Sequence, residues 1–394
     1  MPYDISESKR DWYRQVSQRS RLRKQAAARG ELGRCQTVPS RPALRPETLM
    51  PIREPSGLTA LSLFSGGGGL DLGFERAGFQ HVASFDVLDV CGATLLHNRP
   101  QWKVFSGATG DVNEMDWSLH ANVVDVLHGG PPCQPFSVAG KLFGAADDRD
   151  MWPAFTRAVL AIRPKAFVAE NVPGLLGRRF ASYVDKTIYS PLSHDYHMVA
   201  FRLGATSFGV PQDRQRVFFV GFRSRATARK YVAPFGEHSA QKDLISEKST
   251  TLGARAALGL PDIGFDNCAP TLRSGFTGPR KTTSVLNSRA SQKVWGDLKI
   301  WPNGVQKSRQ AALQFPPENG HFRLSVQDCA LLQGFPNDWR FAGAVYQVLG
   351  QIGNSVCPPV AYAVANSVAD ALDARTLREK AQSTIRRAAL QALL

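Results

Sequence analysis

The sequence lacks the patterns of a membrane protein, a metalloprotein or a disulfide-rich secreted protein. No apolar run approaches the roughly 20 residues that cross a bilayer, and the N-terminus has no apolar signal core. The six cysteines are scattered, without Cys-x-x-Cys spacing or clustered histidine, which disfavours a zinc site or a disulfide framework. The thiols are therefore expected to be reduced, in a cytoplasmic protein.

Acidic residues are scarce relative to basic ones. The chain has 33 Asp and Glu against 48 Lys and Arg, a formal charge of +15. This excess favours a polyanionic partner, although a merely basic soluble protein would show it too. The phosphate-binding pattern Gly-x-x-x-x-Gly-Lys-Ser/Thr is also absent, which points away from kinases. With 394 residues, 43% of them hydrophobic, the chain suffices for one large α/β domain and a smaller one.

A short cysteine loop follows a predicted buried strand. Residues 123–127 form an apolar run typical of a strand, and residues 129–137 read Gly-Gly-Pro-Pro-Cys-Gln-Pro-Phe-Ser. The glycines and prolines end the strand abruptly and hold Cys133 in a stiff loop. A thiol fixed at a strand end is placed like a nucleophile, although a lone cysteine is more often a small buried hydrophobe.

A glycine-rich loop joins an earlier strand, 59–64, to a helix that begins near Leu70. Glycines there let the backbone approach a ligand closely, and the helix N-terminus offers free N–H groups. The next strand, 81–85, ends at Asp86, about 20 residues beyond Gly66. An acid at that position can accept both hydroxyls of a ribose, so this order of elements predicts a nucleoside-cofactor site.

Four functional-looking side chains lie at or just past the carboxyl ends of predicted parallel strands: Asp86, Asp111, Cys133 and Glu170. Ligands of open α/β sheets bind at that edge, so the four are expected to share one crevice. Each alone has a structural explanation, since an Asp after a strand is often a helix cap. Their coincidence at one edge favours a site.

A reactive thiolate beside a carboxyl group suits covalent activation of an electron-poor ring. The thiolate of Cys133 would add to the ring while a protonated Glu170 neutralises charge on a ring nitrogen. Burial would help Glu170 to hold its proton at neutral pH. Arg214 and Arg216, at alternate positions entering a strand, could lower the pKa of Cys133. The alternative is that both arginines are solvated residues on an edge.

At these residues the sequence resembles the DNA (cytosine-5)-methyltransferase family. The ordered motifs span roughly residues 58 to 370. They are Phe64-x-Gly66-x-Gly68, the loop 129–137, Glu170-Asn171-Val172, Gln212-x-Arg214-x-Arg216, Arg323 through Gln333-Gly-Phe-Pro336, and Gln351-x-Gly353-Asn-Ser-Val356. The resemblance implies a Rossmann-like S-adenosylmethionine-dependent methyltransferase fold, with a mostly parallel sheet, helices on both faces and a smaller loop-rich target recognition domain.

The resemblance also implies roles for individual residues. Cys133 would attack carbon 6 of a flipped-out cytosine in duplex DNA, Glu170 would contact N3, and Arg216, supported by Arg214, would hold the carbonyl oxygen. S-adenosylmethionine would be bound by Phe64, Gly66, Gly68, Asp86, Asp111, Trp152, Asn354 and Ser355. The DNA contacts would come from Gln134, Ser137, Thr271, Leu272, Arg273, Arg280 and Lys281. No metal is implied.

Composition divides the chain into five segments. Residues 1–57 are a basic arm and Pro-rich linker, with a possible helix from Asp11 to about Ala28, and 58–223 are the catalytic and cofactor-binding domain. Residues 224–320 are loop-rich and basic, where the family keeps its target recognition domain. Residues 321–375 return to the catalytic domain, with a Ser-capped helix at 325–332 and a helix at about 360–372. Residues 376–394 form a basic helical tail.

The leading hypothesis is a DNA cytosine-5 methyltransferase of a restriction-modification system, or a solitary one. Expected with it are a monomer, a separate cognate endonuclease, and a nucleoid-associated location in a prokaryote. Three alternatives stay open: an RNA cytosine-5 methyltransferase, a catalytically silent DNA-binding regulator, and an NAD-dependent dehydrogenase. The basic insert favours duplex DNA over RNA. The cysteine loop has no role in a dehydrogenase.

Overall fold

The computed structural model describes residues 6–33, 37–132, 150–236, 238–239, 249–276 and 282–372. Cys133, Gln134, Ser137, Arg280, Lys281 and the predicted tail helix lie outside these ranges. The chain divides into two compact units. The sheet unit comprises Glu47–Gly209, Arg214–His238 and Ser355–Leu394, and the insert unit comprises Met1–Pro46, Val210–Asp213 and Ser239–Asn354.

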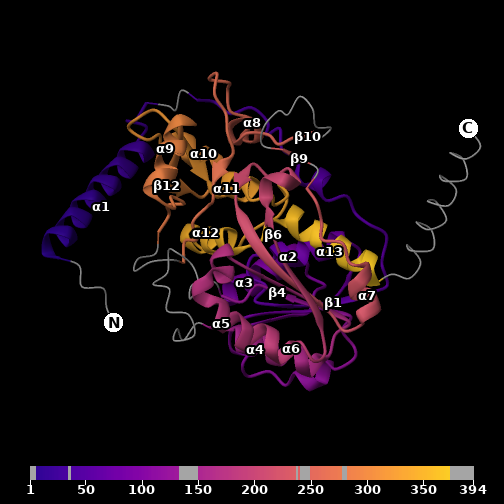
Figure 1. Ribbon diagram of the computed structural model, residues 1–394. Coiled ribbons are helices and arrows are strands. Elements are labelled where there is room, and N and C mark those ends of the chain that lie inside the picture. The colour runs from indigo at the N-terminus through magenta and orange to yellow at the C-terminus, as the bar shows by residue number, and fades with distance from the viewer. Residues whose placement is uncertain are drawn as a thin grey trace, which may run out of the picture. The chain divides into compact units, whose positions relative to one another are not determined.

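A seven-stranded sheet organises the sheet unit, in the order β3-β2-β1-β4-β5-β8-β6 (Figure 1). The strands are β1 (Thr59–Leu63), β2 (Gln80–Asp86), β3 (Val104–Ser106), β4 (Val126–Gly129), β5 (Ala166–Asn171), β6 (His197–Gly204) and β8 (Gln215–Phe222). The first five run parallel, and β8 runs antiparallel to both β5 and β6. The expected mostly parallel sheet is confirmed.

Helices cover both faces of this sheet, as expected. Figure 1 shows α4 (Trp152–Ile162), α5 (Ala181–Val184) and α6 (Ser190–Leu192) on one side, with α2 (Gly69–Arg76) and α13 (Pro358–Leu372) on the other. Alternate residues of each strand point to opposite faces, so Leu61 and Leu63 join the α4 core, whereas Ser62 faces α2. Helix α3 (Asp89–Asn98) follows β2, and α7 (Arg225–Lys230) follows β8.

Helix α2 can pack on α13 because of a glycine. A Cβ at Gly73 would lie 2.5 Å from the Cβ of Ala361, so only glycine allows this approach. The contact brings the C-terminal segment of the chain onto the helix that follows the glycine-rich loop. The predicted helix at 360–372 is therefore confirmed and has a packing partner.

The insert unit consists of short elements. They are α1 (Glu7–Ala28), β7 (Gln212–Asp213), α8 (Ala254–Leu258), β11 (Ala269–Pro270), α9 (Arg289–Asp297), β12 (Ile300–Gln306), α10 (Arg309–Gln314), β13 (Phe322–Ser325), α11 (Val326–Leu332) and α12 (Val345–Asn354). Two more short strands are β9 (His238–Ser239) and β10 (Ser249–Thr250). Strand β12 pairs in parallel with β13, and β7 with β11.

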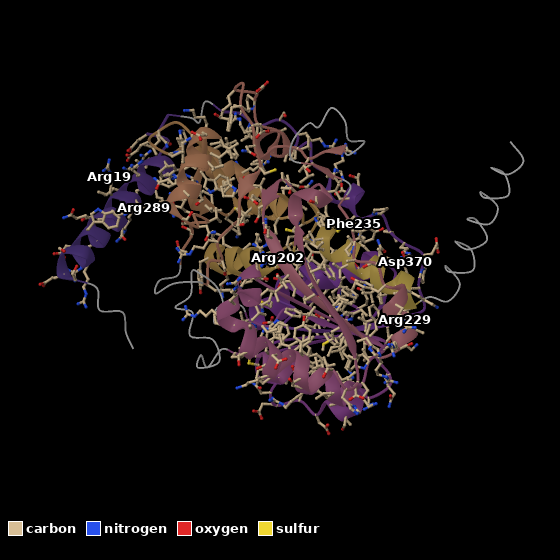
Figure 2. All side chains as sticks on the ribbon, viewed as in Figure 1. Arg19, Arg202, Arg229, Phe235, Arg289 and Asp370 are labelled. Carbon is tan, nitrogen blue, oxygen red and sulfur yellow. The ribbon has the colours of Figure 1, made fainter. Side chains whose placement is uncertain are left out.

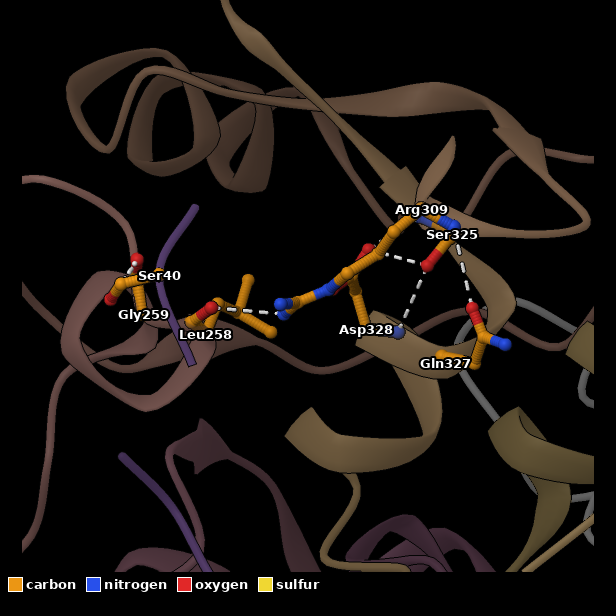
Figure 3. Close-up of polar contacts among 7 residues, drawn as sticks. All are labelled: Ser40, Leu258, Gly259, Arg309, Ser325, Gln327 and Asp328. Atoms are coloured by element: carbon orange, nitrogen blue, oxygen red, sulfur yellow. Dashed lines mark hydrogen bonds and ion pairs between the residues drawn. The ribbon is translucent and has the colours of Figure 1, made fainter. Parts of the chain in front are cut away.

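The predicted Ser cap of the helix at 325–332 is confirmed. The Ser325 hydroxyl accepts from the Asp328 backbone N–H, and the Asp328 carboxylate accepts from Ser325 N at 2.8 Å. Arg309 Nε lies 2.6 Å from the same carboxylate and Arg309 Nη2 donates to Leu258 O at 2.9 Å (Figure 3). These contacts join α8, α10 and α11, three separate segments of the insert.

The role of residues 224–320 as a target recognition domain stays a prediction. The largest segment of the insert unit runs from Ser239 to Asn354, and within it β13 pairs with β12 and Asp328 is tied to Arg309. The first 46 residues also belong to the insert unit: Ser40 N donates to Gly259 O at 2.7 Å. Of the C-terminal segment 321–375, only the residues from Ser355 onward lie in the sheet unit.

Candidate active site

The glycine-rich loop adopts backbone conformations that favour glycine. Gly66 has φ +55° and Gly68 has φ +82°, in the left-handed region. Phe64, the residue directly after β1, also has a positive φ of 55°. For a bulky side chain this conformation is uncommon and costs free energy, and such residues cluster at ligand sites. The loop is therefore shaped for something other than local stability.

Asp86 holds this loop in place. Its carboxylate accepts from Gly66 N and from Leu88 N, each at 2.8 Å. Burial raises the pKa of Asp86, and these two hydrogen bonds oppose the rise. The Cys91 thiol also hydrogen-bonds this carboxylate. The two oxygens have four lone pairs between them, so one acceptor position remains. Asp86 can therefore order the loop and still accept a ribose hydroxyl.

Asp111 lies near Asp86, but not directly at a strand end. Strand β3 ends at Ser106, and a 3-10 turn, Gly107–Gly110, comes between. A Cβ at Gly110 would lie 2.3 Å from Asp86 O, so the turn packs tightly on the end of β2. The Asp111 carboxylate accepts from Asn113 N at 2.9 Å. The structure thus brings Phe64, Gly66, Gly68, Asp86 and Asp111 to one edge of the sheet.

The start of the late motif reaches the same loop. A Cβ at Gly69 would lie 2.2 Å from Val356 O and 3.1 Å from the Ser355 Cβ. Arg214 Nη2 donates to Ser355 O at 2.9 Å. Ser355 therefore lies between the glycine-rich loop and the arginine motif. Asn354, the residue before it, ends α12, and its predicted contact with a cofactor stays a prediction.

Trp152 is fully buried at the start of α4. Its ring packs edge-on against Phe155 and Phe219, with centroid distances of 5.9 and 5.4 Å, and its backbone N–H donates to the Asp150 carboxylate at 3.2 Å. Tyr183 donates to the same carboxylate at 2.7 Å. These contacts place Trp152 in the α4 core, and its predicted contact with a cofactor stays a prediction.

Glu170 and Arg216 form a buried ion pair. Arg216 Nε lies 2.8 Å from Glu170 Oε1, and Glu170 is 6% exposed. Burial raises the pKa of Glu170 above its usual value near 4.5, and the guanidinium groups of Arg216 and Arg214 oppose the rise. Both arginines, which were predicted to act on Cys133 and the base, thus also act on the Glu170 carboxyl group. Both Glu170 and Asn171 lie inside β5 rather than after it.

The root of the cysteine loop lies against this pair. A Cβ at Gly130 would lie 3.2 Å from Glu170 Oε2, and Asn171 Nδ2 donates to Pro131 O at 3.1 Å. Cys133 lies outside the described residues. It follows Pro131 by two residues in the chain.

Cys357 is a thiol near this pair that the sequence reading did not single out. It is buried, and burial raises its pKa to about 11, with Arg214, Arg216 and Glu170 as its charged neighbours. It therefore stays protonated at neutral pH and is a poor nucleophile. Its position after the late motif, Gln351 to Val356, was the available signal.

A buried carboxyl group under the glycine-rich loop was also missed. Asp71, on α2, accepts from Ser84 Oγ at 2.7 Å, and Ser65 Oγ donates to Ser62 Oγ at 2.8 Å. Burial raises the pKa of Asp71 to about 6. Small hydroxyl residues in the middle of otherwise apolar strands were the sequence signal for this polar layer between α2 and the sheet.

In the insert unit, Gln212 organises the predicted Thr271-Leu272 pair. Leu272 N donates to Gln212 Oε1 at 3.1 Å, and Gln212 Nε2 donates to Gln333 Oε1 at 2.8 Å. Thr271 Oγ1 donates to Asp213 O, the residue before Arg214, at 2.5 Å. Arg273 is half-buried on the same segment. Leu272 is 2% exposed, so its side chain is a packing residue in this unit.

The sheet order, its antiparallel β8, the glycine-rich loop and the acid at the end of β2 together define a class. They are the features of Rossmann-like methyltransferases that use S-adenosylmethionine, and the loop and Asp86 fit a nucleoside cofactor. Among the described residues, no three His, Cys, Asp or Glu side chains are grouped to hold a metal ion. No helix in the described ranges is long and apolar enough to span a membrane.

Comparison with known proteins narrows the class to a family. The family model of C-5 cytosine-specific DNA methylases matches residues 58–370. Type II methyltransferase M.NgoMIV of Neisseria gonorrhoeae is 34% identical over 327 residues, which cover 80% of this chain and 98% of that protein. M.FnuDI of Fusobacterium nucleatum is 30% identical over 347 residues, covering 84% and 98%. The chain belongs to the C-5 cytosine-specific DNA methylase family.

The fold agrees with a solved structure of a Spodoptera frugiperda DNMT2 mutant, with a TM-score of 0.53 at 17% identity, covering 79% of this chain and 99% of that one. The family transfers a methyl group from S-adenosylmethionine to carbon 5 of cytosine in DNA. This chain is therefore a DNA (cytosine-5)-methyltransferase with S-adenosylmethionine as its methyl donor.

Proposed function

We propose that this enzyme methylates a cytosine flipped out of a specific duplex sequence, through a covalent bond between Cys133 and carbon 6 of the base. The observation that carries the proposal is the buried Glu170–Arg216 pair at 2.8 Å, against the root of the cysteine loop. An ionisable carboxyl group and a guanidinium beside a tethered thiol provide an acid, a carbonyl-oxygen ligand and a nucleophile.

Each group has a defined task in this mechanism. The Cys133 thiolate adds to carbon 6, and the ring electrons move toward N3, which takes the proton of Glu170. Arg216 holds the carbonyl oxygen, with Arg214 behind it. S-adenosylmethionine supplies the methyl group that carbon 5 receives. A water molecule takes the proton from carbon 5, the C5–H electron pair forms the C5=C6 bond, and the S–C6 electron pair returns to sulfur. N3 then gives its proton back to Glu170, and the ring is restored.

The raised pKa of Glu170 supports its role as proton donor. Burial favours the neutral carboxyl group, whereas Arg216 favours the carboxylate. When a base enters and Arg216 turns to its carbonyl oxygen, the carboxyl group loses part of its positive partner and is left buried. Its affinity for a proton then rises at the moment when one is needed at N3.

The cofactor would be held at the sheet edge by Phe64, Gly66, Gly68, Asp86, Asp111 and Ser355, with Trp152 and Asn354 as the remaining predicted contacts. Asp86 would accept a ribose hydroxyl and Asp111 would lie toward the adenine. The support is the conformation of the loop and the remaining acceptor position of Asp86.

The insert would read the DNA sequence. Its contacts would come from Thr271, Leu272 and Arg273, together with Arg280, Lys281, Gln134 and Ser137. Gln212 ties the Thr271-Leu272 segment to the residues directly before Arg214, which would couple recognition to the base pocket. A stacked cytosine cannot reach a thiol, so flipping is required and costs a few kcal/mol.

The relatives are Type II methyltransferases, so we propose that this enzyme protects DNA from a cognate endonuclease that acts separately, or is a solitary methylase. A monomer and a nucleoid-associated cytoplasmic location remain predictions. Sedimentation with and without duplex DNA would test the first.

The test is methyl transfer from labelled S-adenosylmethionine to duplex DNA and, in parallel, to tRNA. Label in DNA with none in tRNA is the expected result, and label only in tRNA would overturn the proposal. Bisulfite sequencing of DNA from cells that express the protein should show protected cytosines in one short sequence. Protection scattered without sequence context would contradict specific recognition.

A further inference from the structure

Helix α1 carries four basic residues along one side. Arg10, Arg14, Arg21 and Lys24 are spaced by four, seven and three residues, which at 3.6 residues per turn places them on one face. All four side chains are exposed. The stripe covers 14 residues, or about 21 Å at 1.5 Å per residue. We call these four residues the basic stripe.

The opposite side of α1 is anchored to the insert unit. Arg23 Nη1 lies 2.6 Å from Glu318 Oε1, and Arg23 Nη2 donates to Pro316 O at 3.0 Å. Arg19 Nη2 also reaches Glu318, at 3.1 Å. Arg23 additionally lies over the Phe315 ring, 6.0 Å from its centroid. Arg19 follows Arg10 by nine residues, two and a half turns, so the anchor faces away from the basic stripe.

The stripe therefore points away from the unit that carries it. Figure 1 shows the C-terminal end of α1 beside the α9–β12–α10 region, with its N-terminal half extending outward. Nitrogen-tipped side chains follow the helix, including Arg19 in Figure 2. Arg21 and Lys24 form no ion pair within the described residues, and Arg14 pairs only with exposed Asp11 at 3.0 Å. Such an exposed pair is weak.

Helix α1 lies outside residues 58–370, the part of the chain that the family model matches. It has a fixed attachment to the insert unit and four cations that face outward.

We propose that the basic stripe of α1 binds the phosphate backbone of the substrate duplex, next to the segment that the insert reads. This inference rests on duplex DNA as the substrate. DNA carries a phosphate charge about every 1.7 Å of its axis, so a stripe of about 21 Å meets several phosphates. The contacts are independent of base sequence; they add affinity and position the protein, while sequence choice stays with the insert.

An anionic lipid surface is the other polyanion that a basic helix fits. Trp12, Val16 and Leu22 are exposed on α1. Trp12 and Val16 lie on the side that carries Arg19 and Arg23, because each is spaced from them by three, seven or eleven residues. A membrane-binding helix needs its apolar face free. The anchor occupies the end of that face, so the charges favour DNA.

The test is a variant in which all four stripe residues become Gln: Arg10, Arg14, Arg21 and Lys24. Its affinity for a 40-base-pair mixed-sequence duplex is measured by fluorescence anisotropy between 50 and 200 mM salt. Each phosphate contact adds about 0.9 to the slope of log affinity against log salt, so the slope should fall by about 3. The affinity at low salt should fall at least tenfold. The maximal methylation rate at saturating DNA should stay within about twofold.

Two further variants make the test specific. Changing the stripe arginines to Lys and Lys24 to Arg keeps the charge and should keep the affinity. Changing Lys186, Arg225, Arg229 and Lys230 to Gln removes four exposed charges from the sheet unit and should change the slope by less than 1. Helix α7, which carries three of these, follows β8 at the amino-terminal edge of the parallel strands, away from the site.

Three results would overturn the proposal. The stripe variant could keep the wild-type salt slope, the sheet-unit variant could lose as much affinity as the stripe variant, or the stripe variant could lose only binding to phosphatidylserine vesicles. Failure of the proposed function would look different, since the wild type would then methylate no duplex DNA.

Discussion

Removing Arg216 should destabilise the protein in a way that depends on pH. In an Arg216→Leu variant, Glu170 remains buried at 6% exposure without the guanidinium that lies 2.8 Å away. Leaving a buried charge unpaired costs about 3–5 kcal/mol. Glu170 can instead take up a proton, which at pH 7 costs about 3 kcal/mol for a group of usual pKa 4.5. Protonation costs less than an unpaired buried charge, so the variant should lose at most about 3 kcal/mol of its free energy of unfolding.

Because Glu170 takes up a proton in the Arg216→Leu variant, the loss of stability depends on pH. In the variant, the folded-state pKa of Glu170 rises further above its unfolded value, so the folded form binds the extra proton. Its contribution to stability is fully present below pH 4.5 and is lost as pH rises through the folded-state pKa. The difference from wild type should therefore be small at pH 5 and between about 1 and 3 kcal/mol at pH 7.5.

The assay is urea unfolding of both proteins at the two pH values. Arg202→Leu is the matched control, because Arg202 is exposed on β6, opposite Val217, and so is adjacent in register to Arg216 (Figure 2). The control should lose less than about 0.5 kcal/mol at either pH. A loss by Arg216→Leu that is the same at pH 5 and pH 7.5 would refute the coupling to Glu170.

Three further predictions concern buried polar groups. Asp86→Asn should raise KM for S-adenosylmethionine at least tenfold, because one charge-assisted hydrogen bond worth about 1.5–3 kcal/mol is lost, and an unchanged KM in steady-state kinetics would contradict this. Burial raises the pKa of Asp71 from 3.8 to about 6. The contribution of this shift to the free energy of unfolding is therefore fully present below pH 3.8 and is lost as pH rises through about 6. In urea unfolding, the free energy of unfolding of Asp71→Asn relative to wild type should therefore rise by on the order of 3 kcal/mol between pH 4 and pH 7. If the two proteins changed in stability with pH in parallel, the raised pKa would be excluded. Gln212→Leu should lose about 1–3 kcal/mol in the same assay by leaving Leu272 N and other buried groups unsatisfied, whereas exposed Gln215→Leu should be neutral; equal effects would show that burial is not the cause.

Local signals predicted the elements on which the site depends. The strand–glycine–helix order around Gly66, the acid at the end of the next strand and the Ser325 cap each depend on neighbouring residues, and the structure has all three. Glu170 and Arg216 were expected to act on the same base, but their ion pair was not predicted. It depends on the antiparallel pairing of β5 with β8.

Contacts between distant segments could not be read in this way. Helix α12 was not predicted, and it contains Gly350 and Gly353, which are poor helix formers. Tertiary packing requires glycine at these two positions of the helix. A Cβ at Gly350 would lie 2.3 Å from the Phe276 ring, and one at Gly353 would lie 2.6 Å from Ser274 N. The extent of the insert to Asn354 has the same origin, since the partner of β13 is a strand within the insert.

The buried polar residues were missed for a related reason. Asp71 looks like one more charge on a surface helix until α13 covers α2, and Cys357 looks like any other cysteine until burial raises its pKa to about 11. Gln212 was noted only as the first residue of the arginine motif. Its bond to Leu272 joins segments 60 residues apart, a separation that no local pattern reports.

The most direct test of the mechanism is the methylated base itself. Duplex DNA is incubated with S-adenosylmethionine and the wild type, Cys133→Ser or Cys329→Ala, the last a control at a buried thiol in α11, and the nucleosides are then identified by mass spectrometry. The wild type and the control should yield 5-methyl-2′-deoxycytidine, and Cys133→Ser should yield none while still binding DNA. Methylation by Cys133→Ser, or a methyl group on an exocyclic nitrogen, would contradict the covalent mechanism.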